Sequence, residues 1–231
     1  MPNIKLKPSK LHKLQKDNKI KDAIKIIRNN CEIDHVNFGK YVATFNSLST
    51  DNIVYKLVPM NINYFKEKKD KDPYDLYRDS KRMKYFFLVI KDILYCDKNV
   101  FLYTQEKIKI VRKITIFVVI NVILIIYKMI KENLVCCDID IHNLGEKNHD
   151  ILLFDLQGLR SYEYCDKDKL YRNIKMYLDS IKYTDYKNKY KNKEDLLLGL
   201  KEIFLDIYKI NKKYLTLNEI SSIDFKINLV F

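Results

Sequence analysis

Three oxygen-bearing side chains stand close together between residues 134 and 159, in the sequence LVCCDIDIHNLGEKNHDILLFDLQGL. Asp138 and Asn143 are five residues apart, and Asp155 follows 17 residues after Asp138, directly behind an apolar run. A hairpin that turns between Gly145 and Asn148 would place Asn143 and Asp155 at the same end of a two-stranded ribbon. Asp138 would then lie nearby, on the preceding loop.

Side chains of these types can bind a hard cation that is also bound by phosphate oxygens. Mg²⁺ prefers oxygen ligands and keeps several waters, so Asn143 and Asp155 together with nucleotide oxygens suffice to hold it. Asp138, away from the metal, can orient an attacking hydroxyl and accept its proton. The spacing therefore predicts a magnesium site that serves phosphoryl transfer.

The same stretch also contains five side chains of types that bind zinc: Cys136, Cys137, Asp138, Asp140 and His142. Adjacent cysteines on a strand or loop point in opposite directions, and no second Cys/His pair stands at zinc-site spacing. We therefore expect the cysteines to pack as small apolar side chains and His142 to be a loop residue near a nucleotide.

A buried helix is predicted before this loop. Residues 114–127, ITIFVVINVILIIY, are the most apolar stretch of the chain, but they number only 14. A membrane-spanning helix needs about 20 apolar residues. The sequence therefore predicts a core helix and no membrane span.

The N-terminal half has the texture of strands. β-branched and aromatic residues predict one strand over 36–45 and a second over 52–60, joined by a short turn. Helical character over 72–90 begins at Asp72-Pro73, and residues 99–105 predict another short strand. The C-terminal part is expected to be helical over about 166–215, with a polar loop at 186–195, and residues 222–231 to be a short strand or a packed tail.

Residues 1–30 form a basic leader with a surplus of +7, since nine Lys and Arg face only Asp17 and Asp22. Ile20, Ala23, Ile24 and Ile27 stand at helical spacing, which predicts a basic amphipathic helix. Two roles stay open: a helix docked on its apolar face, or an arm that binds an acidic or nucleic-acid partner.

The composition limits the class of protein and the kinds of partner further. Of 231 residues, 47% are hydrophobic and 32% charged, which supports a packed core and excludes disorder of the whole chain. The net charge is +13, but 37 of the 43 basic residues are Lys, which favours phosphate attraction over base-specific readout. Five Cys without a C-x-x-C motif, and no secretory leader, predict a reduced intracellular setting, cytoplasmic or nuclear.

The order D-x-x-x-x-N, strand, aspartate resembles the catalytic loop and metal-binding motif of the protein-kinase-like superfamily. The resemblance implies that Asp138 is the catalytic base, Asn143 a metal ligand, and Asp155 the aspartate of the DFG-type motif. The predicted core helix also stands where kinases place the long helix before the catalytic loop.

The upstream chain is similar to a kinase as well. Ile53-Val54-Tyr55-Lys56 resembles the V-A-I-K strand, which implies that Lys56 binds the α- and β-phosphates of ATP. Gly39 stands where the glycine-rich phosphate loop is expected, and the strand at 99–105 resembles the one that leads into the hinge. Glu67 and Asp75 are both candidates for the acidic partner of Lys56.

Several family features are missing. Cys136 and Cys137 replace the His and Arg of H-R-D, DFG is reduced to Asp155-Leu156-Gln157, and no A-P-E motif follows. Such a chain is similar to the small atypical, RIO-type kinases that lack an activation segment.

The resemblance implies an α+β, two-lobed protein-kinase-like fold. The expected parts are the leader (1–30), a small β-rich N-lobe (31–105) and a shortened, mostly helical C-lobe (106–231). The implied activity is that of an atypical Ser/Thr protein kinase that uses ATP and Mg²⁺ and acts on a protein substrate. A pseudokinase scaffold, a small-molecule kinase and a basic polyanion-binding protein remain the alternatives.

Overall fold

The computed structural model describes residues 25, 33–38, 43–47, 52–59, 71–96, 100–136, 138–156, 158–186 and 190–231. The chain divides into two compact units. The first, here the sheet unit, comprises residues 1–68, 72–82 and 89–107. The second, here the helical unit, comprises residues 69–71, 83–88 and 108–231.

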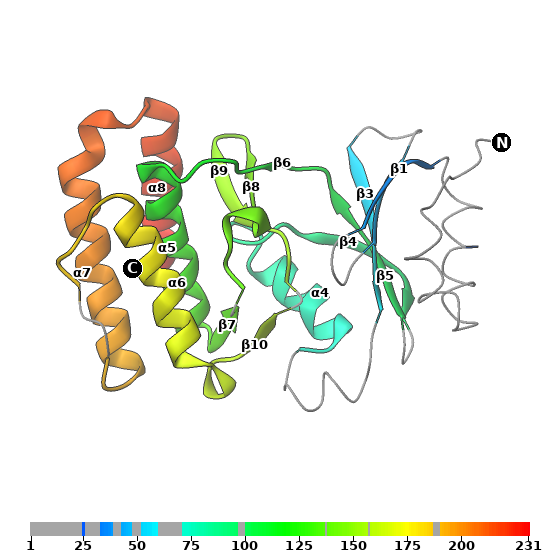
Figure 1. Cartoon of the computed structure of the whole chain (residues 1–231), viewed down its shortest axis with the longest axis horizontal. Coiled ribbons are helices and arrows are strands. Elements are labelled where there is room, and N and C mark those ends of the chain that lie inside the picture. The colour runs from blue at the N-terminus through cyan, green and yellow to red at the C-terminus, as the bar shows by residue number, and fades with distance from the viewer. Residues whose placement is uncertain are drawn as a thin grey trace. The chain divides into compact units, whose positions relative to one another are not determined.

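An antiparallel five-stranded sheet, in the order β1-β2-β3-β5-β4, is the centre of the sheet unit (Figure 1). Helix α4 belongs to the same unit and packs against β4. The bounds are β1 (Ile33–Phe38), β2 (Ala43–Ser47), β3 (Ile53–Pro59), α4 (Pro73–Arg82), β4 (Ile90–Cys96) and β5 (Val100–Glu106).

Two predictions for the sheet unit were wrong in detail. The segment expected to be one strand over 36–45 is a pair of antiparallel strands, β1 and β2, because Phe38 pairs with Ala43 and the chain must reverse between them. The helix expected over 72–90 ends at Arg82, and its apolar second half leads into β4. The strands predicted at 52–60 and 99–105 are confirmed as β3 and β5.

The helical unit surrounds one apolar helix with small sheets and three further helices (Figure 1). Its strands are β6 (Lys109–Ile110), β7 (Leu134–Cys136), β8 (Leu144–Lys147), β9 (Asp150–Leu153) and β10 (Leu159–Ser161). Its α-helices are α5 (Ile116–Lys131), α6 (Lys167–Ser180), α7 (Lys193–Asn211) and α8 (Leu217–Val230). Three short 3₁₀ turns are η1 (Ile141–Asn143), η2 (Tyr162–Tyr164) and η3 (Lys212–Tyr214).

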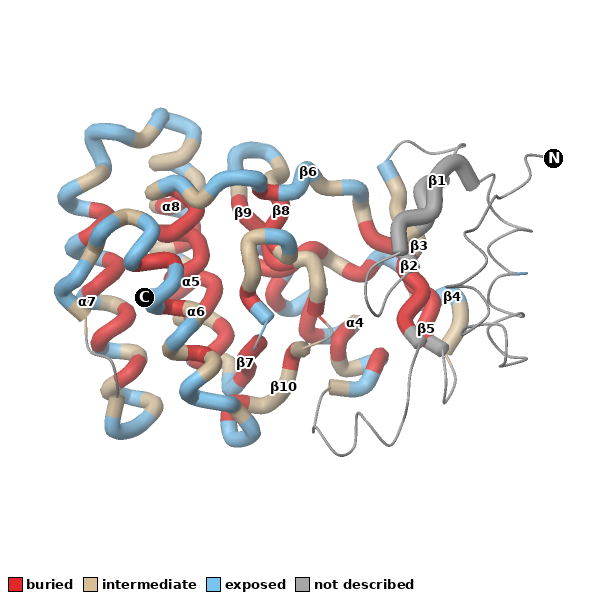
Figure 2. Tube along the Cα trace, viewed as in Figure 1, coloured by how far each residue is buried: buried red, intermediate tan, exposed pale blue. Residues whose placement is uncertain are grey.

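The predicted core helix is confirmed as α5, and Figure 2 shows it buried along most of its length. Thr115 caps it by accepting from the Val118 N–H at 3.3 Å. α7 and α8 pack against α5, which removes its apolar surface from water. Across the described ranges, no helix has both the length and the apolarity that a bilayer crossing requires.

The predicted hairpin is present, but its turn was misplaced. β8 and β9 pair antiparallel from Leu144↔Leu153 to Lys147↔Asp150, so Gly145 lies inside a strand. Asn148 and His149 form the turn with φ of 50° and 60°. Positive φ at both central residues is what a two-residue hairpin with right-handed strand twist requires.

The C-terminal segment is a helix, and the expectation of a strand or tail over 222–231 was wrong. Thr216 and Glu219 form a capping box that starts α8. Ile223, Lys226 and Val230 then stand at helical spacing on its buried side. The two helices expected over 166–215 are confirmed as α6 and α7. Apart from Lys25, the leader lies outside the described residues.

The molecule is therefore an α+β protein, as the sequence predicts. A β-rich unit with one described helix precedes a mostly helical unit. Within the helical unit, a buried helix, a short loop and a hairpin follow one another in the expected order.

Candidate functional site

Lys56 lies in the middle of β3, between Thr44 of β2 and Tyr103 of β5. Only 7% of the residue is exposed, so it is not an ordinary solvated strand lysine. Lysines are almost never buried unless they are paired. The sheet unit thus holds a buried cation at the position that the sequence singles out.

Of the two acidic candidates for a partner of Lys56, Glu67 lies outside the described residues. Asp75 is half-buried at the start of α4 and forms an ion pair with the exposed Arg78. Asp79, one turn further along α4, is only 8% exposed and accepts from Arg82 at 3.0 Å. α4 therefore buries Asp79, an acidic residue that was not among the predicted partners of Lys56.

The signal for Asp79 was present in the sequence as helical spacing. Leu76, Asp79, Ser80 and Met83 follow one another at i, i+3, i+4 and i+7, and all four are buried. Ser80 Oγ also accepts from the Ile90 N–H of β4 at 3.1 Å, which fixes α4 against the sheet. Gly39, the predicted phosphate-loop glycine, lies outside the described residues between β1 and β2.

The loop after β7 carries Asp138, whose side chain is exposed to solvent. The next residue, Ile139, is completely buried, and its carbonyl accepts from the Tyr177 hydroxyl of α6 at 3.1 Å. Burial raises the pKa of Tyr177, so this hydroxyl stays a donor. Asp140 Oδ1 then accepts from the His142 N–H at 2.9 Å and starts the turn η1. The loop is thus hydrogen-bonded at Ile139 and at Asp140, while Asp138 is exposed.

Asn143 ends this turn and binds back to Asp138. Its Nδ2 donates to the Asp138 carbonyl at 2.9 Å and to Asp138 Oδ2 at 3.3 Å. Two acceptors on one side fix which end of the amide carries the nitrogen. Asn143 Oδ1 must therefore point away from Asp138, where a cation could meet it.

Strand pairing brings Asp155 to the same place. The Phe154 N–H donates to the Asn143 carbonyl at 3.0 Å, one residue beyond the last β8–β9 pair. Asp155 is half-buried and follows directly. The chain then passes Gly158, where an added Cβ would lie 3.7 Å from Asp138 Cβ. Asp138, Asn143 and the segment of Asp155 are thus gathered at one end of the hairpin.

β9 is held on its second edge as well. The Leu153 N–H donates to the Phe86 carbonyl, and the Leu153 carbonyl accepts from the Leu88 N–H, both at 2.9 Å. Residues 86–88 belong to the helical unit. The strand before Asp155 is therefore hydrogen-bonded on both sides.

The side chains of zinc-binding type in this loop are described except for Cys137, which lies outside the described residues. Among the residues that the structure describes, no three His, Cys, Asp or Glu side chains gather in a way that could hold a metal ion. Cys136 is buried in β7, as expected of a small apolar side chain, and the His142 side chain is 85% exposed. An Asn–Asp pair that shares a cation with phosphate oxygens would still fit.

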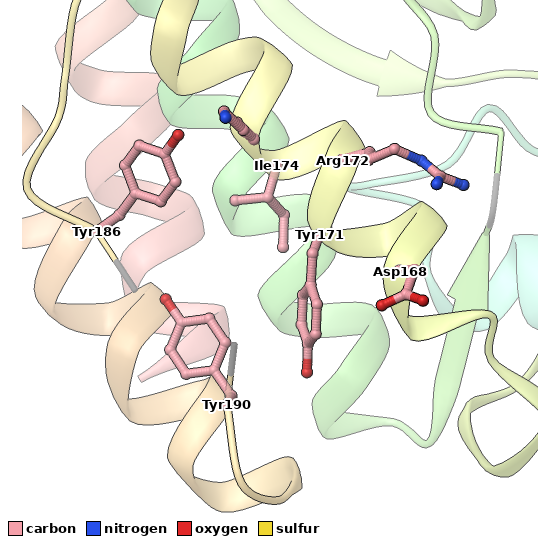
Figure 3. A pocket seen from close by; sticks show the side chains of 7 residues that line it. Asp168, Tyr171, Arg172, Ile174, Tyr186 and Tyr190 are labelled. Carbon is pink, nitrogen blue, oxygen red and sulfur yellow. The ribbon is translucent and has the colours of Figure 1, made fainter. Parts of the chain in front are cut away.

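The helical unit also contains a cavity of about 280 Å³ beside α6. It is lined by Asp168, Tyr171, Arg172, Ile174, Lys175, Tyr186 and Tyr190, and by none of the predicted site residues. Figure 3 shows the Tyr186 and Tyr190 rings on one side of α6, and Asp168 and Arg172 on the other.

No protein-family model matches the sequence, and no curated protein matches it. Among solved structures, the chain is similar to the Cydia pomonella granulovirus kinase PK-1, with a TM-score of 0.44 and 14% sequence identity. The match covers 63% of this chain and 60% of that chain, less than two thirds of the viral kinase.

Proposed function

We propose that this protein is an ATP- and Mg²⁺-dependent phosphotransferase, an atypical kinase that acts on Ser or Thr of a protein. One observation carries the proposal. The side-chain nitrogen of Asn143 donates to Asp138, and the backbone carbonyl of Asn143 accepts from the N–H of Phe154, the residue before Asp155. A base, a metal-ligating amide and a carboxylate are thus tied together by two hydrogen bonds.

In this proposal, Asp138 receives the proton of the attacking hydroxyl. Its side chain is exposed, so a substrate can reach it, and the buried Ile139 beside it keeps the backbone in place. The Asn143 N–H on Oδ2 leaves the other carboxylate oxygen to orient the hydroxyl. Positioning of this kind is most of what a phosphotransferase contributes.

Asn143 Oδ1 and the Asp155 carboxylate fit Mg²⁺ by the chemistry of their donor set. Mg²⁺ is usually held by one or two protein oxygens, with phosphate and water completing the shell. When bound, it would neutralise charge on the transferring phosphate. The hydrogen bonds on both edges of β9 hold Asp155 in position beforehand.

Lys56 is proposed to bind the α- and β-phosphates, with Asp79 as its acidic partner. Both side chains are buried in the sheet unit, and α4 packs on β4 of the sheet that contains β3. Asp75 is the weaker candidate because 30% of its side chain is exposed, against 12% for Asp79.

The segment after Asp155 supports an atypical class. β10 begins at Leu159 and pairs with β7, and α6 begins at Lys167. Only the eleven residues 156–166 separate Asp155 from α6, too few for an activation loop with its own peptide-docking helix. Such shortening agrees with the resemblance to RIO-type kinases.

Two substitutions test the proposal. Asp155→Ala should abolish Mg²⁺-dependent nucleotide binding, whereas Asp138→Ala should keep it and lose turnover. Wild type at 100 times its dissociation constant for Mg-ATP should gain about 2.7 kcal/mol of stability in a thermal-shift titration. Transfer of labelled phosphate to a protein substrate measures turnover.

Asp185→Ala, which changes an exposed aspartate outside the hairpin, is the matched control and should behave as wild type. If Asp155→Ala and Asp138→Ala both transferred phosphate at the wild-type rate, the proposal would be refuted. A wild-type protein that neither binds Mg-ATP nor transfers phosphate would indicate a scaffold instead.

A further inference from the structure

Lys226 is a completely buried lysine in the C-terminal helix α8, away from the proposed chemistry. Its Nζ donates to Asn121 Oδ1 of α5 at 2.8 Å and to the Ile151 carbonyl of β9 at 2.9 Å. It also forms an ion pair with the Asp150 carboxylate. An ammonium group has three N–H donors, so these three acceptors use all of them.

The surroundings show that this lysine is built into the fold. Asp150 Oδ1 also accepts from the Ile151 N–H at 2.8 Å and from Ser222 Oγ of α8 at 3.2 Å. Asn121, completely buried in α5, donates its Nδ2 to the Phe117 carbonyl at 3.0 Å, which turns its Oδ1 toward Lys226. A buried charge persists only when it is paired and hydrogen-bonded in this manner.

Lys226 contacts both β9 and the segment that pairs with its outer edge. The Ile151 carbonyl belongs to β9 itself. The Phe86 ring, 5.4 Å from Nζ, belongs to the segment whose carbonyl and N–H groups bind Leu153. β9 leads directly to Phe154, whose N–H binds Asn143, and then to Asp155.

We propose that Lys226 is a positioning residue that fixes β9 from the C-terminal helix and thereby holds Asp155 and Asn143 in the geometry that binds a divalent cation. The cation-binding part rests on the proposed function; the positioning of β9 does not. Lys226 contacts no reacting atom in this proposal and acts only through the strand.

The test compares two lysines that both connect α8 to the core. Lys226→Met removes the ammonium group at nearly constant length. Lys131→Met is the control for the loss of a lysine that joins α5 to α8, because Lys131 of α5 donates to the Val230 carbonyl of α8 at 2.6 Å. If Lys226→Met does not accumulate as a folded protein, Lys226→Gln, which keeps two N–H donors on a neutral side chain, replaces it.

The first readout is amide hydrogen exchange in peptides that cover residues 150–158, without nucleotide. Lys226→Met should lose protection there, including the Phe154 N–H, while Lys131→Met should keep it. Unchanged protection in Lys226→Met would overturn the inference whether or not the protein binds nucleotide.

The second readout is nucleotide affinity with and without Mg²⁺. Lys226→Met should weaken the Mg²⁺-dependent affinity about tenfold or more, as removal of outer-shell support does at metal sites. The affinity measured in EDTA should stay unchanged, and Lys226→Gln should recover part of the loss. Full Mg²⁺-dependent affinity in Lys226→Met, despite lost protection, would reduce Lys226 to a structural role.

A wild-type protein without Mg²⁺-dependent binding would refute the proposed function and the cation-binding part of this inference. The exchange experiment would then still decide whether Lys226 positions β9. The two failures are therefore distinguishable.

Discussion

The amide of Asn143 shows how one side chain can serve two neighbours. Its nitrogen is committed to Asp138, and the planar amide then directs its oxygen the opposite way. A carboxylate in place of this amide would bring a second negative charge against Asp138. The residue type, and not only the five-residue spacing, is therefore what the geometry requires.

Two glycines near the site should respond oppositely to alanine. At Gly158 an added Cβ would meet Cys136 Sγ at 3.6 Å, an ordinary contact, and φ is not positive. At Gly145 it would lie 2.5 to 2.7 Å from three carbons of Ile108. Gly158→Ala should keep the free energy of unfolding of the wild type. Gly145→Ala should lower it by about 1–3 kcal/mol, because the added methyl group overpacks the site.

Urea denaturation of both glycine variants beside wild type measures this contrast. Equal losses would show that the loop around Gly158 is tighter than its contacts indicate. A stable Gly158→Ala variant would also show that the backbone conformation at residue 158 does not require glycine.

Tyr177→Phe should impair turnover more than nucleotide binding. The substitution leaves the buried Ile139 carbonyl without its hydroxyl donor, at a cost of about 1–3 kcal/mol. Because Ile139 follows Asp138, the loop that carries this proposed base should loosen, while Asn143 and Asp155 keep their hairpin. We expect a lower kcat with nearly unchanged nucleotide affinity.

Tyr186→Phe is the control for Tyr177→Phe, since its hydroxyl binds Asp179 at the surface. Steady-state kinetics and nucleotide titration of both variants would separate the effects. Equal kcat in the two variants would mean that the Tyr177 hydroxyl does not position the loop.

At the scale of elements, the hairpin was predictable but its turn was not. Two β-capable runs around a polar centre indicate a hairpin, yet the strongest turn residue there is Gly145, which lies in β8. The turn uses Asn148 and His149, both with positive φ. Sequence patterns assign such φ values to glycine first, so the turn was placed too early.

His149→Gly should stabilise the protein by about 0.5–1 kcal/mol. Asn-Gly is the preferred pair for a turn with positive φ at both positions, and an L residue in that region carries a steric cost. His149→Ala removes the same ring without relieving the backbone and should give no gain. Chemical denaturation compares the two, and a stability loss in His149→Gly would contradict the turn geometry.

Other elements show where sequence patterns are strong. α5 could be predicted because its apolar run has no alternative to burial, and β3 and β5 because β-branched and aromatic residues fill them. α8 was missed because Lys226 interrupts its apolar face. Asp79 was missed for a similar reason: a charged residue on a buried helix face looks like a surface residue until its neighbours are known.

At the scale of the whole molecule, tyrosines that are wholly or partly withdrawn from water set the alkaline limit of stability. Burial raises the pKa of Tyr162, Tyr183 and Tyr190 from 10 to about 12. Between these values the unfolded chain has lost protons that the folded chain keeps. The free energy of unfolding should therefore be insensitive to these groups below pH 10 and fall between pH 10 and 12.

Urea unfolding at several pH values, followed together with tyrosinate absorbance, checks this prediction. Tyr162→Phe should make the fall less steep, because Tyr162 is 8% exposed and its ionisation would then no longer favour unfolding. A stability that stays flat from pH 10 to 12 would contradict the burial of these phenols.

The placement of Lys226 has a consequence for biosynthesis. Its partner on β9 precedes it by 75 residues, and at 5–20 residues per second the ribosome needs roughly 4 to 15 s to make that length. Throughout this interval Asp150 of the nascent hairpin lacks the Lys226 ammonium group, and α5 lacks its contacts with α8. The apolar surface of α5 that α8 covers therefore stays exposed during synthesis until this helix has been made.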